Sequence, residues 1–291
     1  MGSTRKEIRR FNIKIFMSIK NIIIRLADKV PFGIRDKIRK VPLLKQLQFF
    51  LLKKWVNEES FVATISGGPA KGLVFPVQMP QDKLMWIGTF ELEYAKALQQ
   101  AIRKDWVCYD IGGYKGYYAG IMAISGAAEV YVFEPMPANA KKIELLLALN
   151  PHLPIHLKKY AVSDNTGNAI FRLMPEVTMG KLESSSFQPE DKEIEQISVD
   201  TITLDELIRR GTPEPDFIKI DVEGAEEFVL RGAIELLQRK KPLLMIEVHS
   251  PEIGKRCLNV LKKYYPKISV LETGELPEKG TPEICHYIVS N

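Results

Sequence analysis

The chain has 291 residues, of which 45% are hydrophobic and 26% charged, so it can bury the core of one large domain or two small ones. Its net charge of +5 is uneven: residues 1–56 carry 15 Lys and Arg against three acidic residues, and the remainder carries −7. Because nucleic-acid enzymes concentrate positive charge around their clefts, this acidic remainder argues against DNA or RNA as a partner.

The cysteines and histidines give no sign of a disulfide framework or a metal site. The three cysteines are an odd number without C-x-x-C spacing, and the four histidines lack H-x-x-x-H spacing. We therefore expect a cytoplasmic protein, kept in a reducing compartment, that holds no metal.

Residues 1–57 are predicted to be a basic, amphipathic helical extension. Apolar residues recur at spacings of three and four along Ile8, Phe11, Ile15, Ile19, Ile22, Leu26 and Val30. Lys14, Lys20 and Arg25 interrupt this stretch, which excludes a membrane span and a signal peptide. Two interpretations stay open: packing on the catalytic body or on a second subunit of a homodimer, and peripheral contact with an anionic membrane surface at the inner face of the membrane.

A catalytic domain is expected over residues 58–291, and its first part, 58–105, is expected to hold a hairpin and a helix. Two short strands between Phe61 and Gln78 flank the turn-forming run Ser66 to Gly72, and a helix is predicted over 91–103.

From Trp106 onward, strands and helices alternate, which is typical of a doubly wound α/β sheet. Strands are predicted over 106–111, 129–134, 155–160, 216–221, 242–248, 268–272 and 284–289, and helices over 116–125, 138–149, 204–209, 224–238 and 252–264. Residues 167–173 and the serine-rich segment around 184–186 are predicted to form an insertion over the mouth of the sheet.

Two acidic strand ends and a glycine loop suggest a nucleoside cofactor. The first core strand ends in Asp110 and runs into Gly112, Gly113 and Gly116, and the next strand ends in Glu134. Glycines let the backbone approach a ligand, and a carboxylate at the next strand tip can accept both hydroxyls of a ribose. The G-x-G-x-x-G spacing of a dinucleotide site is missing, and Asp110 would repel a diphosphate but suit a cationic amino group. S-adenosylmethionine fits both ends.

Five ordered blocks between about Gly88 and His249 resemble the FkbM family of class I methyltransferases. They are Asp110-Ile111-Gly112-x-x-x-Gly116, Phe133-Glu134-Pro135, Ala161-Val162-Ser163-Asp164, Val199-Asp200 with Leu204-Asp205-Glu206-Leu207, and the run from Phe217 to Glu226. The resemblance implies a Rossmann-like, seven-stranded sheet, S-adenosylmethionine as cofactor, and O-methylation of a hydroxyl on a sugar, glycan or other secondary metabolite. The chain departs from the family at Gly113 and Tyr114, where Ala and Asn are usual, so the loop shape or a methionine contact is expected to differ.

The chemistry of the cofactor suggests a role for each of the candidate binding residues. Glu134 is expected to accept the ribose hydroxyls, Asp110 to hold the methionine end, and the backbone from Gly112 through Gly113 to Gly116 to pass beneath the cofactor. Ala161, Val162 and Asp164 are expected to flank the adenine, although Asp164 is equally well explained as a turn residue.

The catalytic candidates follow the fourth and fifth strands. Methyl transfer is an in-line displacement at a sulfonium, so the enzyme must align the acceptor oxygen and exclude water. Asp221 and Glu223 lie where methyl acceptors sit in this architecture. His249, at the end of the fifth strand, is the preferred base for the acceptor proton, and Asp221 is the competing base.

Two other classes of function are compatible with parts of the sequence. A nicotinamide oxidoreductase would share the sheet and Glu134, but the chain lacks its glycine spacing. The stronger alternative is a non-catalytic, membrane-associated protein on a retained methyltransferase fold.

Overall fold

A computed structural model describes residues 60–173, 180–182, 196–277 and 284–291. The helical extension predicted over residues 1–57 and the serine-rich segment around 184–186 lie outside these residues and stay predictions. Among the described residues, no helix combines the length and hydrophobicity needed to cross a membrane.

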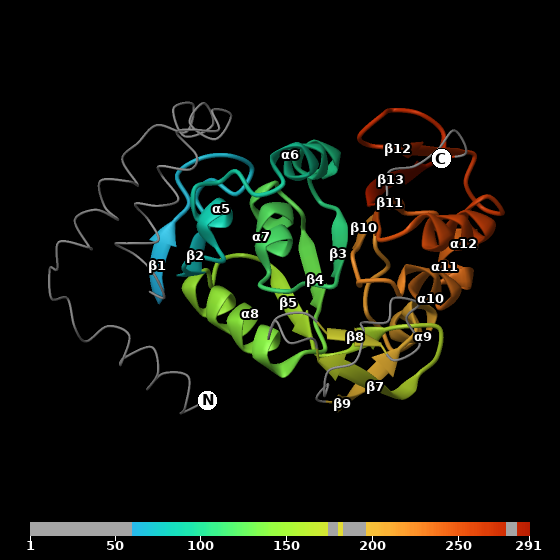
Figure 1. The fold of residues 1–291 in the computed structure, drawn as a ribbon, viewed down its shortest axis with the longest axis horizontal. Coiled ribbons are helices and arrows are strands. Elements are labelled where there is room, and N and C mark those ends of the chain that lie inside the picture. Colours follow the sequence, from blue (N-terminus) through green and yellow to red (C-terminus); the bar gives the residue numbers. More distant parts are fainter. Residues whose placement is uncertain (1–59, 174–179, 183–195, 278–283) are drawn as a thin grey trace, which may run out of the picture.

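The central sheet has seven strands in the order β12-β13-β11-β10-β3-β4-β5 (Figure 1). These are β3 (Val107–Ile111), β4 (Glu129–Phe133), β5 (Ile155–Lys158), β10 (Phe217–Ile220), β11 (Leu243–Val248), β12 (Lys267–Val270) and β13 (Cys285–Ser290). β3 pairs in parallel with β4 and with β10, whereas β13 runs antiparallel to both of its neighbours. The predicted α/β class with a seven-stranded, mostly parallel sheet is confirmed.

Helices cover both faces of this sheet (Figure 1). One side carries α6 (Leu92–Ala101), α7 (Tyr117–Ile124) and α8 (Pro137–Leu149), and the other carries α9 (Leu204–Arg209), α10 (Glu226–Arg231), α11 (Ile234–Arg239) and α12 (Pro251–Leu261). Along β4, Val130 and Val132 join the core of the first side, and Tyr131 and Phe133 join the core of the second. Burial on both faces explains why the core strands read as continuous apolar runs in the sequence.

The hairpin predicted between residues 61 and 78 is present. β1 (Ser60–Thr64) pairs antiparallel with β2 (Val74–Gln78), and the short helix α5 (Lys83–Trp86) follows. The Asn150 side chain, at the end of α8, accepts a hydrogen bond from the Val74 N–H (3.0 Å) and donates one to the Val74 carbonyl (2.7 Å). The hairpin is thereby fixed to the helix layer on the α7 and α8 side.

The prediction of a single helix over 224–238 is wrong, because α10 and α11 are separate helices that meet near Gly232. A Cβ atom at Gly232 would lie 2.0 Å from the carbonyl oxygen of Ser163, so this backbone packs directly on the loop after β6. Asp205 stabilises the break, since its carboxylate accepts the N–H groups of Glu235 and Leu236 at the start of α11.

A small sheet occupies the region predicted as an insertion. Its order is β6-β9-β7-β8, formed by β6 (Ala161–Val162), β7 (Gly167–Leu173), β8 (Gly180–Leu182) and β9 (Gln196–Ile202). The sequence patterns did not predict these strands as a sheet of their own. Phe171 on β7 lines a cavity at the edge of the central sheet, so the small sheet contributes one wall of that cavity.

Candidate active site

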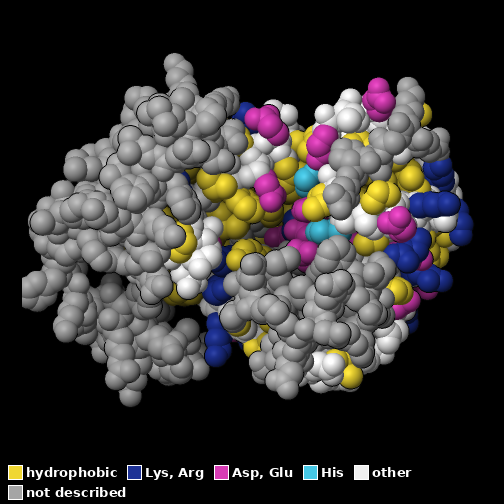
Figure 2. Space-filling model, in the orientation of Figure 1, with side chains coloured by type: hydrophobic (Ala, Val, Ile, Leu, Met, Phe, Trp, Pro, Cys, Tyr) yellow, Lys and Arg dark blue, Asp and Glu magenta, His cyan; other side chains and the backbone are white. Residues whose placement is uncertain are grey.

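A cavity of about 430 Å³ lies at the carboxyl ends of β3, β4, β10 and β11. β4 and β5 follow β3 on one side of it in the sheet, whereas β10 and β11 lie on its other side. Open α/β sheets bind ligands at the point where the strand order reverses in this way. The predicted residues Gly112, Gly113, Glu134, Ala161, Val162, Asp221 and Glu223 all line this cavity. Acidic side chains and histidines gather near the centre of the face shown in Figure 2.

The glycine loop after β3 is shaped by close packing. Gly112 has a φ of 84°, and a Cβ there would lie 1.7 Å from the carbonyl oxygen of Asp221. A Cβ at Gly113 would lie 2.1 Å from a methyl group of Val132. The N–H groups of both glycines donate to the carbonyl oxygen of Phe133, which fixes the loop against β4. The departure from the family at Gly113 therefore has a local cause, since the alanine usual there would collide with Val132.

Glu134 lies at the tip of β4, 5% exposed, with its carboxylate beside the glycine loop. Its two oxygens accept the N–H groups of Tyr114 (2.8 Å) and Met136 (2.9 Å). Burial raises the pKa of Glu134 to about 7, and these hydrogen bonds oppose the rise. The Asn139 side chain also donates to this carboxylate. A carboxylate has about four acceptor positions, so Glu134 keeps capacity for a ligand hydroxyl.

Asp110 lies behind the cavity wall and is paired with Lys219. The two residues are register partners on β3 and β10, and Lys219 Nζ lies 3.2 Å from Asp110 Oδ1. Lys219 also donates to the Gly112 carbonyl (3.1 Å) and to Asp221 Oδ2 (3.2 Å). Burial would lower the pKa of Lys219, but Asp110 and Asp221 raise it above its ordinary value. Lys219 thus joins the glycine loop to the loop after β10.

Four predicted residues do not line the cavity. Asp110 and Gly116 lie behind it, Asp164 is exposed after β6, and His249 stands behind Asp221 and Glu247. Gly116 has a φ of 78°, and its close contact is with Leu146 of α8. Its glycine is explained by helix packing.

His249 is surrounded by carboxylates. Its Nδ1 lies 2.9 Å from Oε1 of the fully buried Glu226, and its Nε2 faces Asp221, Glu223 and Glu247 at 3.6–3.7 Å. Burial would lower the pKa of His249, but the hydrogen bond to Glu226 and the charges of Asp221 and Glu223 raise it to about 9. These carboxylates make His249 bind its own proton more tightly than a free imidazole does, so it is a poor base for the acceptor proton.

The charged residues Glu91, Lys219 and Glu247 also line the cavity and were not predicted as site residues. Glu91 precedes α6 and accepts a hydrogen bond from the Tyr118 hydroxyl; burial raises its pKa. Lys219 and Glu247 carried a signal in the sequence, since each is a charged residue inside an otherwise apolar strand, and such residues are rarely buried without a partner. Glu91 had no such signal, because it stands in a loop.

Residues 110–276 match the family model described as the methyltransferase FkbM domain. A hexuronic acid methyltransferase, AglP, from Haloferax volcanii is 28% identical over 217 residues, which cover 73% of this chain and 83% of that protein. The solved structure of a methyltransferase FkbM from Methylobacillus flagellatus is 19% identical with a TM-score of 0.43, covering 65% of this chain and 45% of that one. A precorrin-6y C5,15-methyltransferase from Geobacter metallireducens is 13% identical with a TM-score of 0.41, covering 69% of this chain and 89% of that one.

Proposed function

The chain belongs to the FkbM family of methyltransferases, and we propose that it transfers the methyl group of S-adenosylmethionine to a hydroxyl oxygen of a sugar, glycan or other secondary metabolite. One observation carries this proposal. A single cavity has Glu134 and the glycine loop at one end, and Asp221, Glu223 and Glu247 at the other. β4 and β11 are three strand spacings apart, roughly 14 Å, which leaves room for a cofactor and an acceptor side by side.

The residues present fit S-adenosylmethionine. Glu134 has acceptor capacity for a ribose hydroxyl, and the backbone of Gly112 and Gly113 lines the cavity beside it. Ala161 and Val162 supply an apolar wall for the adenine. Tyr117 also lines the cavity, and its buried hydroxyl has no hydrogen-bond partner among the described residues.

When bound, this cofactor supplies an electrophilic methyl group on a sulfonium. The chain must then orient the acceptor oxygen and accept its proton. We assign the proton to Glu223 in place of His249, because Glu223 lines the cavity whereas His249 stands behind Asp221 and Glu247. Glu223 has a φ of 53°, a left-handed conformation that costs a glutamate about 1–2 kcal/mol. Such strain persists where the surrounding structure holds a side chain in a required place.

The sugar acceptor is supported by the relative from Haloferax volcanii, which is named as a hexuronic acid methyltransferase. The non-catalytic alternative is not favoured, because residues 110–276 match a methyltransferase domain and carboxylates stand at both ends of the cavity.

Replacing Glu134 with Gln tests the cofactor assignment. The variant loses charge-assisted hydrogen bonds of about 1.5–3 kcal/mol, so S-adenosylmethionine affinity is expected to fall by about tenfold or more. In the wild type, affinity should also rise between about pH 6 and pH 8, because the Glu134 carboxyl loses its proton near pH 7 and accepts better when charged. This step should be missing in the Gln variant. Isothermal titration across pH measures both effects.

The matched control is Glu129→Gln, at the opposite end of β4, which should keep both the affinity and the pH step. A folded Glu134→Gln protein with wild-type affinity at every pH would remove the ribose assignment.

A further inference from the structure

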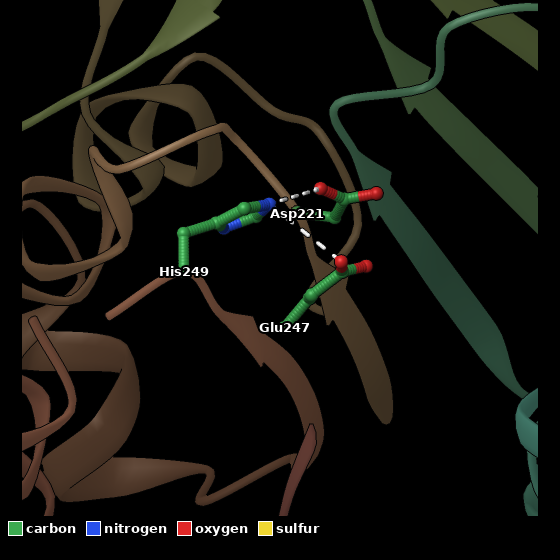
Figure 3. Close-up of side chains that lie close together, drawn as sticks. All are labelled: Asp221, Glu247 and His249. Carbon is green, nitrogen blue, oxygen red and sulfur yellow. Dashed lines mark ion pairs between the residues drawn. The ribbon is translucent and has the colours of Figure 1, made fainter. Parts of the chain in front are cut away.

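His249 presents one ring nitrogen to a group of carboxylates without bonding to any of them. Nε2 lies 3.6 Å from Glu247 Oε1, 3.6 Å from Glu223 Oε2 and 3.7 Å from Asp221 Oδ1. Each distance exceeds an ordinary N–H···O hydrogen bond. Figure 3 shows the ring of His249 pointing toward the carboxylates of Asp221 and Glu247, which come from the ends of two adjacent strands.

The other ring nitrogen is held by a buried carboxylate. Nδ1 lies 2.9 Å from Glu226 Oε1, which also accepts the N–H of Gly224 (3.0 Å). Histidines that bind metals almost always donate their second N–H to such a carboxylate, which directs the lone pair of Nε2 toward the ion. Glu226 is fully buried, and its Oε2 has no hydrogen-bond partner among the described residues. A cation beside His249 would compensate this buried negative charge.

The distances suit a small divalent cation. One donor atom each from Asp221, Glu247 and His249 lie within 4.8 Å of one another. Octahedral coordination at about 2.1 Å places neighbouring donors about 3 Å apart and opposite donors about 4.2 Å apart. The Nε2 distances of 3.6 Å and 3.7 Å fall between these values. Lys219 occupies only Oδ2 of Asp221, so Oδ1 remains on the side of His249.

We propose that Asp221, Glu247 and His249 bind one divalent cation, and that neighbouring oxygens of the acceptor complete its coordination. The part of this proposal that concerns the acceptor rests on the proposed function. Both Asp221 and Glu247 line the cavity, so the ion would face the acceptor. It would also allow an acidic acceptor, such as a uronic acid, to bind beside Glu91 and Glu223, which would otherwise repel it.

The test is a titration of the full-length, chelator-treated protein with Mn²⁺ as the probe. Binding is measured as the loss of the free Mn²⁺ signal in electron paramagnetic resonance. We expect saturable binding of one ion per chain. His249→Gln and Glu247→Gln should each weaken it by more than about tenfold. The exposed residues His152 and Glu252 supply matched controls, and His152→Gln and Glu252→Gln should bind as the wild type does. Circular dichroism and S-adenosylmethionine titration verify that each variant is folded.

The outcomes separate this inference from the proposed function. Absence of saturable Mn²⁺ binding, or equal binding by folded His249→Gln and Glu247→Gln proteins, overturns the metal site and leaves the methyltransferase proposal standing. Mn²⁺ binding without S-adenosylmethionine binding keeps the site and removes the proposed function. Methyl transfer at full rate in excess chelator overturns the role of the ion in holding the acceptor.

Discussion

The Glu223→Gln enzyme is expected to transfer methyl groups about 10² to 10⁴ times more slowly than the wild type, with nearly unchanged affinity for S-adenosylmethionine. The amide keeps the size of the side chain but cannot accept the acceptor's proton at neutral pH. Glu223 lies on β10's side of the cavity, away from the ribose position at Glu134, so cofactor binding should not depend on it. Single-turnover rates with saturating cofactor measure the loss.

The exposed residue Glu235 gives the matched control, because Glu235→Gln changes the same group outside the cavity. Excess Mn²⁺ should not restore the Glu223→Gln rate if Glu223 accepts the proton, since the proposed ion ligands remain in place. Near-normal turnover of Glu223→Gln would instead show that another cavity carboxylate takes the proton, or that none is required.

Replacing Lys219 with Met is expected to lower the free energy of unfolding by about 3–5 kcal/mol. Met has a similar length, so the main loss is electrostatic: Asp110, which is fully buried, would have to stay charged without its partner or take up a proton. The carbonyl of Gly112 would also lose a hydrogen bond, which loosens the loop beneath the cofactor. Urea unfolding followed by circular dichroism measures the change.

Two comparisons isolate the charge effect. Lys71 is exposed, so Lys71→Met should change the unfolding free energy by less than about 0.5 kcal/mol. The double variant Lys219→Met with Asp110→Asn should recover part of the lost stability, because no buried charge is left uncompensated. A Lys219→Met protein as stable as the wild type would mean that Asp110 is uncharged in the folded protein.

The core strands could be predicted from the sequence because burial on both faces makes them short, continuous apolar runs. Helix 224–238 was predicted as one element because the break at Gly232 is caused by contact with Ser163, about 70 residues away, and no local pattern records such a contact. The strands β6 and β8 have two and three residues, too few for an alternating pattern to stand out.

In the candidate site, the sequence predicted correctly that residues at the ends of neighbouring parallel strands lie together. Glu134, Gly112 and Asp221 reached the same cavity because parallel strands end at one edge of the sheet. It missed the partner of Asp110, since the pairing with Lys219 depends on the register between β3 and β10. It also favoured His249 as the base, because the sequence does not show that Glu226, Asp221 and Glu223 surround the ring and raise its pKa.

The most direct test of the account is methyl transfer from S-adenosylmethionine carrying a ¹³C-labelled methyl group to a panel of sugars and glycans that includes uronic acids, with product analysis by NMR. The account predicts a labelled methyl group bonded to an acceptor oxygen, formed by the wild type and strongly reduced in both Glu134→Gln and Glu223→Gln. Label on nitrogen or carbon, or equal product from these folded variants, would contradict it.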